Sequence, residues 1–126
     1  MNPQTNSKPN AETLELELRA HRPACWPDLP DGWVLPRYEG LSVGNLAATS
    51  ARALGATLSD ALLPLRADLL GDLTDGVERV VLVVVDALGW LQLRRAMARY
   101  PDLVFHKLAA SGRLLPITTT FASTTT

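Results

Sequence analysis

The sequence is poor in several features, and each shortage excludes a class of protein. Its only cysteine, Cys25, cannot form a disulfide within the chain, which indicates a reducing compartment. The chain also lacks an excess of charge of one sign. Its 12 basic and 13 acidic residues leave a net charge of −1, whereas nucleic-acid binders carry a basic excess. The longest apolar run, 80–85, is far shorter than the roughly 20 residues of a membrane helix. The polar N-terminus lacks the apolar core of a secretory signal. We therefore expect a cytoplasmic protein with neither a nucleic-acid polymer nor a membrane as partner.

Motifs for common cofactors are missing as well. The chain contains no G-x-G-x-x-G and no G-x-x-x-x-G-K-[ST], which weighs against binding of dinucleotides and P-loop nucleotides. The two histidines, His21 and His106, do not have the spacing of metal ligands. Cys25 has no neighbouring base that would activate it. None of these three residues is therefore predicted to take part in chemistry.

The chain divides by composition near residue 34. We interpret residues 1–34 as a polar N-terminal tail followed by a proline-rich connector, and residues 35–126 as the folded part. Within the tail, residues 13–19 alternate apolar and charged side chains. This alternation is typical of a strand with one wet face, although glutamate and leucine also favour helices, so both interpretations stay open.

The folded part shows helical spacing in four places and strand character in two. We predict helices over residues 46–54, 58–70, 88–100 and 101–110, with Gly55 as the cap of the first. The run 80–85 contains five valines and one leucine, which is typical of a strand buried on both faces in a parallel sheet. Residues 113–119 form the second predicted strand. This order predicts an α/β fold built on a βαβ unit with a mostly parallel sheet.

Asp86 is the first candidate site residue, because it directly follows the predicted strand 80–85. In open α/β sheets, ligands bind beyond the carboxyl ends of the strands, where a carboxylate needs a metal ion, a cation or backbone donors as partner. The alternative is that Asp86 caps the helix that follows. The position alone favours neither role.

The second candidate is the hydroxyl-rich end of the sequence. If the two predicted strands are parallel, residues 114–119 bring Thr120 to the same sheet edge as Asp86. A threonine there can act as a nucleophile when a neighbouring metal lowers the pKa of its hydroxyl. The simpler alternative is that Ser123 or Thr124 caps a helix and the other threonines only favour strand structure. Taken alone, the composition of this run favours the simpler alternative.

Two motifs together resemble a known family. V-V-L-V-V-V-D-A-L-G-W (80–90) and P-I-T-T-T-F-A-S-T-T-T (116–126) are similar to the N-terminal part of the alkaline phosphatase superfamily, in particular its type I phosphodiesterase/nucleotide pyrophosphatase branch. The stretch L-P-R-Y-E-G-L-S-V-G-N-L-A (35–47) is similar to bacterial members of that superfamily. The resemblance implies a three-layer fold with a mostly parallel central sheet, of which residues 35–126 would be the N-terminal part.

The resemblance also implies roles for two residues. Asp86 corresponds to a ligand of a divalent metal ion, and Thr120 to the nucleophile that is also a metal ligand. The implied cofactor is a pair of divalent metal ions, with zinc expected, and the implied substrate is a small phosphate ester. The sequence departs from the family pattern at two positions: Ala87 stands where glycine is common, and Ala122 replaces the usual proline.

Counting ligands leads to a further expectation. A pair of zinc ions needs about six protein ligands, and the family places the remaining aspartates and histidines after the nucleophile motif. We therefore expect this chain to be a fragment, truncated after that motif, of a hydrolase that works through a phospho-threonine, and to be inactive alone. The alternative is a small non-catalytic α/β binding or interaction domain. A haloacid-dehalogenase-like phosphatase is disfavoured, because Leu88 stands where that family has its second aspartate.

Overall fold

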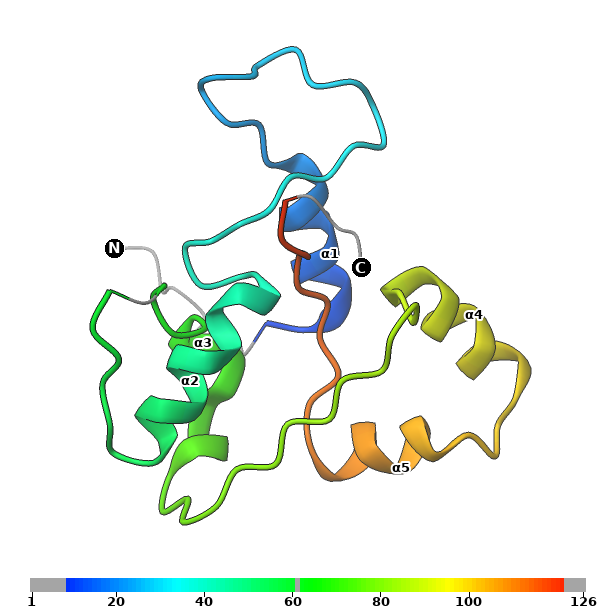
Figure 1. Cartoon of the computed structure of the whole chain (residues 1–126). Helices are drawn as coiled ribbons and strands as arrows, with labels where there is room; N and C mark the ends of the chain where they lie inside the picture. Colours follow the sequence, from blue (N-terminus) through cyan, green and yellow to red (C-terminus); the bar gives the residue numbers. More distant parts are fainter. Residues whose placement is uncertain (1–8, 61, 122–126) are drawn as a thin grey trace, which may run out of the picture.

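The structure is a computed structural model that describes residues 9–60 and 62–121. In these residues it contains five α-helices, two short 3-10 helices and no sheet (Figure 1). The α-helices are α1 (Ala11–Ala20), α2 (Leu46–Ala53), α3 (Ala67–Leu70), α4 (Trp90–Arg99) and α5 (Val104–Ser111), and the 3-10 helices are η1 (Val43–Asn45) and η2 (Gly71–Thr74). In Figure 1, α2 and α3 lie on one side of the molecule and α4 and α5 on the other.

The ambiguous alternating stretch 13–19 is helical and belongs to α1. The helix starts at Asn10, whose side-chain oxygen accepts a hydrogen bond of 2.8 Å from the backbone N–H of Thr13. Leu14 and Leu18, four residues apart, share the buried face, while Leu16 remains 66% exposed. Helical spacing of two leucines therefore decides the structure here, rather than the alternation along the chain.

The core is a small cluster of leucines contributed by distant parts of the sequence. Leu14 and Leu18 of α1 pack with Leu41, Leu65 and Leu69. Complete burial of one leucine side chain contributes roughly 1.5–3 kcal/mol, so these contacts hold α1 against α3 and the chain before η1. α1, although it lies within the 1–34 segment, thus supplies part of the core.

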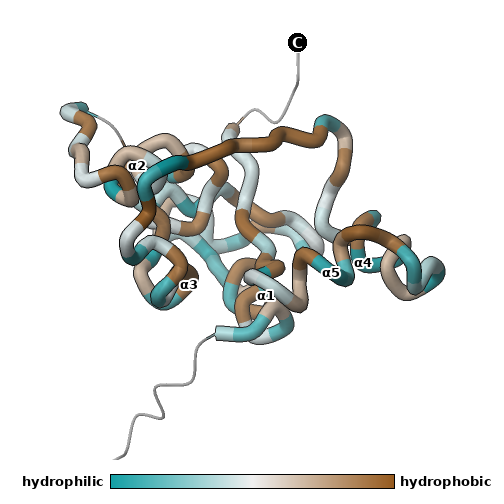
Figure 2. Tube along the Cα trace, turned by 90° about the horizontal axis from the view of Figure 1, so that it is seen from below, coloured by the Kyte–Doolittle hydropathy of each residue, from teal (hydrophilic) through white to brown (hydrophobic). Residues whose placement is uncertain are grey.

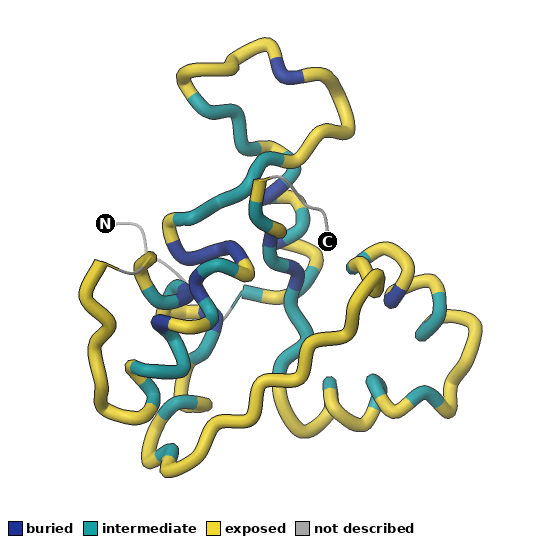
Figure 3. Tube along the Cα trace, in the orientation of Figure 1, coloured by how far each residue is buried: buried dark blue, intermediate teal, exposed yellow. Residues whose placement is uncertain are grey.

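The predicted α/β fold, with its parallel sheet and βαβ unit, is wrong. In the described part of the chain the only β interaction is an isolated parallel bridge between Ser42 and Thr118. Residues 80–85 cross the molecule as an apolar but exposed chain without a partner strand (Figures 2 and 3). Valine favours an extended backbone, but a strand also needs a neighbouring backbone to accept and donate its hydrogen bonds. No such neighbour runs beside 80–85 among residues 9–60 and 62–121, and so these residues do not form the three-layer architecture.

Three of the four predicted helices are confirmed. α2, α4 and α5 lie within a few residues of the predicted 46–54, 88–100 and 101–110, and Gly55 after α2 has a φ of +76°. The predicted helix 58–70 is wrong except for its last turn, α3. Asp60 has a φ of +58°, which no α-helix contains, and Pro64 cannot donate a helical hydrogen bond.

Candidate functional site

Asp86 and Thr120 line the same groove, although they come from distant parts of the sequence. The groove has a volume of about 850 Å³ and runs between the chain around Asp86, the start of α4 and residues 114–120. We call it the Asp86 groove. Both residues thus line one groove in the absence of the sheet that was expected to bring them together.

Asp86 lies on the exposed side of this groove. One of its carboxylate oxygens accepts a hydrogen bond of 2.7 Å from the backbone N–H of Ala87. The alternative role of helix cap is wrong, because α4 begins only after Gly89. The N–H of Gly89 donates instead to the side-chain oxygen of Gln92, at 2.6 Å. The other carboxylate oxygen of Asp86 has no hydrogen-bond partner among the described residues.

The turn that carries Asp86 has an unusual backbone. Ala87 adopts a φ of +57°, in the left-handed region, where a side chain costs roughly 1–2 kcal/mol. Glycine avoids that cost, which gives a physical reason for glycine being common at this position in the family that the sequence resembles. The departure at Ala87 therefore strains the turn directly beside the candidate carboxylate.

Thr120 is half-buried and stands at the end of a segment that is tied to the chain before η1. The backbone N–H of Thr118 donates to the carbonyl of Leu41, and the N–H of Val43 donates to the carbonyl of Thr118, both at 2.8 Å. The hydroxyl of Ser42 donates to the carbonyl of Thr119 at 3.2 Å. These bonds hold the two residues before Thr120 in place.

The residue after Thr120 is anchored as well. The N–H of Phe121 donates to the hydroxyl of Tyr38 at 2.9 Å. On the other side, a Cβ placed on Gly44 would lie 3.6 Å from the methyl group of Thr120 and only 2.8 Å from Leu62. The backbone of Gly44 thus passes close to Thr120, and a larger residue there would displace its neighbours.

Asn45 organises the chain that holds Thr120, and the sequence analysis did not single it out. It is fully buried, and its side-chain amide donates to the carbonyls of Tyr38 and Leu63, both at 2.7 Å. Its side-chain oxygen accepts from the N–H of Ser42 at 2.9 Å. The spacing S-x-x-N in S-V-G-N, which resembles a helix capping box, is the sequence signal that could have found it.

Thr118 proves to be a structural residue. It is buried, its hydroxyl accepts from the N–H of Arg37 at 2.9 Å, and the same hydroxyl donates to the carbonyl of Leu41 at 3.0 Å. Ser42, Asn45 and Thr118 together are called the polar cluster below. The threonine-rich run thus includes at least one hydroxyl that holds the backbone through hydrogen bonds, a role that neither alternative had predicted.

The oxygen ligands in the Asp86 groove are too few for the expected metal pair. No group of three or more His, Cys, Asp or Glu side chains that could hold a metal ion occurs in the part of the chain that the structure describes. A zinc site takes three or four protein ligands, and Asp86 and Thr120 are only two ligand residues. The described residues therefore do not by themselves fit a pair of zinc ions, and no reaction step is derived through one.

The remaining residues considered from sequence lie away from this groove. His106 contacts the backbone carbonyl of Met97 at 3.1 Å through Nε2, His21 follows the last turn of α1, and Cys25 is exposed. Ala122, Ser123 and Thr124 lie outside the described residues. Over residues 9–60 and 62–121, no helix is long and apolar enough to cross a membrane.

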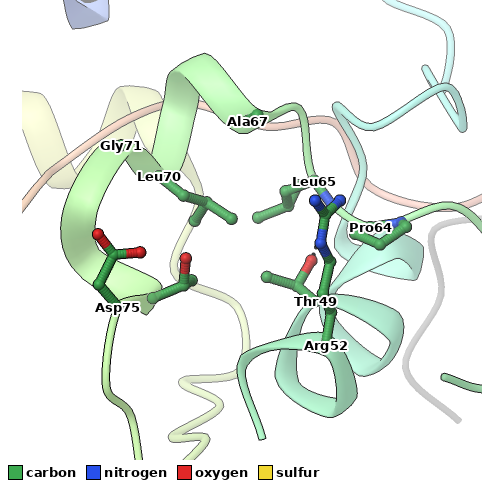
Figure 4. A pocket seen from close by; sticks show the side chains of 9 residues that line it. Thr49, Arg52, Pro64, Leu65, Ala67, Leu70, Gly71 and Asp75 are labelled. Carbon is green, nitrogen blue, oxygen red and sulfur yellow. Dashed lines mark hydrogen bonds between the residues drawn. The ribbon is translucent and has the colours of Figure 1, made fainter. Parts of the chain in front are cut away.

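A smaller pocket of about 320 Å³ lies between α2 and the turn formed by α3 and η2 (Figure 4). Arg52 and Asp75 stand in opposite walls of this pocket. The hydroxyl of Thr49 is already engaged, since it accepts from the N–H of Leu65 at 2.8 Å. Neither predicted site residue lines this pocket, so it adds nothing to the candidate site.

No family model, no curated protein and no solved structure matches this chain. The likeness to the alkaline phosphatase superfamily therefore rests on the motif residues alone.

Proposed function

We propose that this chain is part of a metal-dependent phosphoric ester hydrolase of the phosphodiesterase/nucleotide pyrophosphatase kind, with Thr120 as nucleophile. The observation that supports the proposal best is the shared groove. Asp86 and Thr120, each chosen from its own motif, line one cavity large enough for a small phosphate ester.

The proposed reaction is a double displacement at phosphorus. The hydroxyl oxygen of Thr120 forms a bond to phosphorus while the bond to the leaving alcohol breaks, and water then hydrolyses the phospho-threonine. The proton lost by the threonine hydroxyl balances the proton gained by the leaving alcohol. In this scheme the contribution of the chain is the position of Thr120, which the bonds to Ser42 and Tyr38 on either side of it maintain.

Divalent metal ions, with zinc expected, are part of this proposal. Asp86 and Thr120 are the proposed ligands from this chain. Because the described residues supply only these two, the proposal requires further ligands from outside them, and the isolated chain should not turn over substrate.

The isolated chain gives the first test. With zinc and a nitrophenyl phosphate ester, it should release no nitrophenol above the rate of the buffer. Zinc-dependent release that Thr120→Ala abolishes would contradict the proposed inactivity but support the nucleophile. Release that survives Thr120→Ala would contradict the role of Thr120.

The second test uses the complete gene product that contains this sequence. Brief reaction with substrate followed by acid quench should leave a phosphoryl group on Thr120, detectable by mass spectrometry. Thr120→Ala should abolish this label together with the activity, whereas Thr57→Ala, which changes an exposed threonine that does not line the Asp86 groove, should keep both. Activity of the complete product that survives Thr120→Ala would refute the phospho-threonine mechanism.

A further inference from the structure

A second groove adjoins the Asp86 groove, shares Trp90, Ile117 and Thr119 with it, and lies between α1, the start of α4 and residues 116–119. Its volume is about 540 Å³, within the range of small-molecule sites. It is lined mainly by apolar side chains and by arginines, with Glu15 as its only acidic residue. We call it the arginine groove.

Part of the lining of the arginine groove is apolar. Leu18 of α1, Val34 of the connector, Leu91 of α4 and Ile117 contribute to it. Leu91 is 47% exposed and Val34 is 41% exposed, so this apolar surface is accessible to a ligand. Covering such surface contributes about 25 cal/mol for each Å² removed from water, which favours a ligand with a flat apolar body.

The acidic residue of the groove is already neutralised. The carboxylate of Glu15 accepts hydrogen bonds from the indole N–H of Trp90 at 2.8 Å, from Arg19 at 2.9 Å and from Arg94 at 2.7 Å. Hydrogen bonding by Trp90 and then by Arg19 lowers the pKa of Glu15, so it stays ionised at neutral pH. Two guanidinium groups, those of Arg19 and Arg94, therefore pair with its single negative charge.

Arg95 adds a further positive charge that no described residue balances. It is exposed, it lines the groove, and no hydrogen bond or ion pair of its side chain occurs within the described residues. Around the groove, three arginines of α1 and α4 thus face one glutamate. An anion is favoured there, and the guanidinium fork fits a carboxylate through two parallel hydrogen bonds.

Trp90 gives the groove a fixed aromatic wall. Its ring nitrogen is held by Glu15, and the guanidinium of Arg94 lies 5.8 Å from the ring centroid. Both contacts restrain the ring, so a planar ligand can stack against it at little entropic cost.

We propose that the arginine groove binds small aromatic carboxylates, with the ring on the apolar lining beside Trp90 and the carboxylate on Arg95. The proposal does not depend on the phosphoesterase proposal, because it uses neither Asp86 nor Thr120.

The test follows the indole N–H signals of the ¹⁵N-labelled chain during titration with naphthalene-2-carboxylate. Trp90→Phe identifies the Trp90 signal among those of Trp26 and Trp33. The Trp90 signal should shift in a saturable manner. Naphthalene-2-methanol, which keeps the rings but lacks the charge, should bind at least about tenfold more weakly, since a charge-assisted pair of hydrogen bonds is lost.

Two matched variants locate the anion. Arg95→Gln should weaken naphthalene-2-carboxylate about tenfold. Arg99→Gln, one turn further along α4 with its guanidinium over Tyr100, should leave the affinity unchanged. Equal effects of both variants, equal binding of the neutral compound, or shifts confined to Trp26 and Trp33 would each overturn the proposal. The spectra of the free variants show at the same time that each remains folded.

Discussion

The chain around η1 and the segment 80–85 place their side chains in opposite ways. In the first, the polar residues Ser42 and Asn45 are 0% exposed. In the second, Val81 is 86% and Val83 is 76% exposed. Hydropathy alone would assign these two regions the other way round, so their difference shows what hydropathy leaves out.

Hydrogen bonding accounts for the buried side of the contrast. A polar group can be buried at low cost when its donors and acceptors are satisfied, and all three hydrogen bonds of the Asn45 side chain are made within the chain. The segment 80–85 has the opposite need, since its valines would gain from burial but no described element covers them. Whether a side chain is buried thus depends on whether hydrogen-bonding groups or covering side chains are available to it. These are supplied by residues elsewhere in the sequence.

Among the changes at polar residues, the largest effect is expected for a substitution within the polar cluster. Asn45→Ala removes three hydrogen bonds of a fully buried side chain and leaves the N–H of the buried Ser42 without its partner, which should lower the free energy of unfolding by about 3 kcal/mol. Urea unfolding followed by circular dichroism measures this. Asn10→Ala, which removes an exposed helix cap, is the matched control and should cost about 1 kcal/mol. Equal losses would mean that burial of Asn45 carries no special weight.

A smaller loss is expected at the other side of the same cluster. Thr118→Val keeps the shape of the side chain but removes the hydroxyl bonded to Arg37 and Leu41, at a cost of about 1–2 kcal/mol. Thr119→Val changes an exposed hydroxyl and should stay within about 0.5 kcal/mol of the wild type. If both variants unfold at the same urea concentration, the buried hydroxyl does not stabilise the bridge.

The contact between α1 and α4 should lose its contribution to stability in acid, whereas the contribution of the polar cluster should not depend on pH. Bonds to Trp90 and Arg19 hold the pKa of Glu15 below its ordinary 4.5, so its contribution is present above pH 4.5 and is lost as pH falls through the lowered pKa. The stability difference between wild type and Glu15→Gln should therefore shrink below pH 4.5. The polar cluster has no ionisable side chain, so the cost of Asn45→Ala should remain constant over the same pH range, below pH 4.5 as well as above it. A difference for Glu15→Gln that is independent of pH would contradict the assignment.

The smallest effect is expected in the exposed segment. Val83→Thr replaces a valine that is 76% exposed, so the free energy of unfolding should change by less than about 0.5 kcal/mol. Leu41→Ala, at a side chain that is 1% exposed, should in contrast cost about 2–5 kcal/mol. A large loss for Val83→Thr, seen in the same urea experiment, would show that the segment is covered in solution.

Local signals in the sequence predicted much of the helical structure. α2, α4 and α5 have helical spacing of their apolar residues, and this information lies within each segment. The strand prediction for 80–85 failed because a strand is defined by its neighbour, and the five valines say nothing about which backbone lies alongside. Residues 13–19 show the same limit, since only packing of Leu14 and Leu18 on the core selects the helix.

The sequence was enough to select Asp86 and Thr120 as candidates, but not the residues that hold the surrounding chain in place. Asp86 and Thr120 stand out as a carboxylate and a hydroxyl at the ends of apolar segments, and both line the Asp86 groove. Asn45 could not be singled out by composition, because its importance comes from bonds to Tyr38 and Leu63, which lie on either side of it in the sequence. The left-handed backbone of Ala87 was equally hidden, since alanine rarely adopts it.

The exposed valines of 80–85 also bear on how readily the protein aggregates. Short uncharged runs of β-branched residues with free backbone donors are the usual starting points of intermolecular cross-β aggregation. Arg79 and Asp86 flank the run with opposite charges, in the position of gatekeeper residues that oppose stacking of copies. We therefore expect that replacing Asp86 by a neutral residue lowers the highest concentration at which the chain stays in solution.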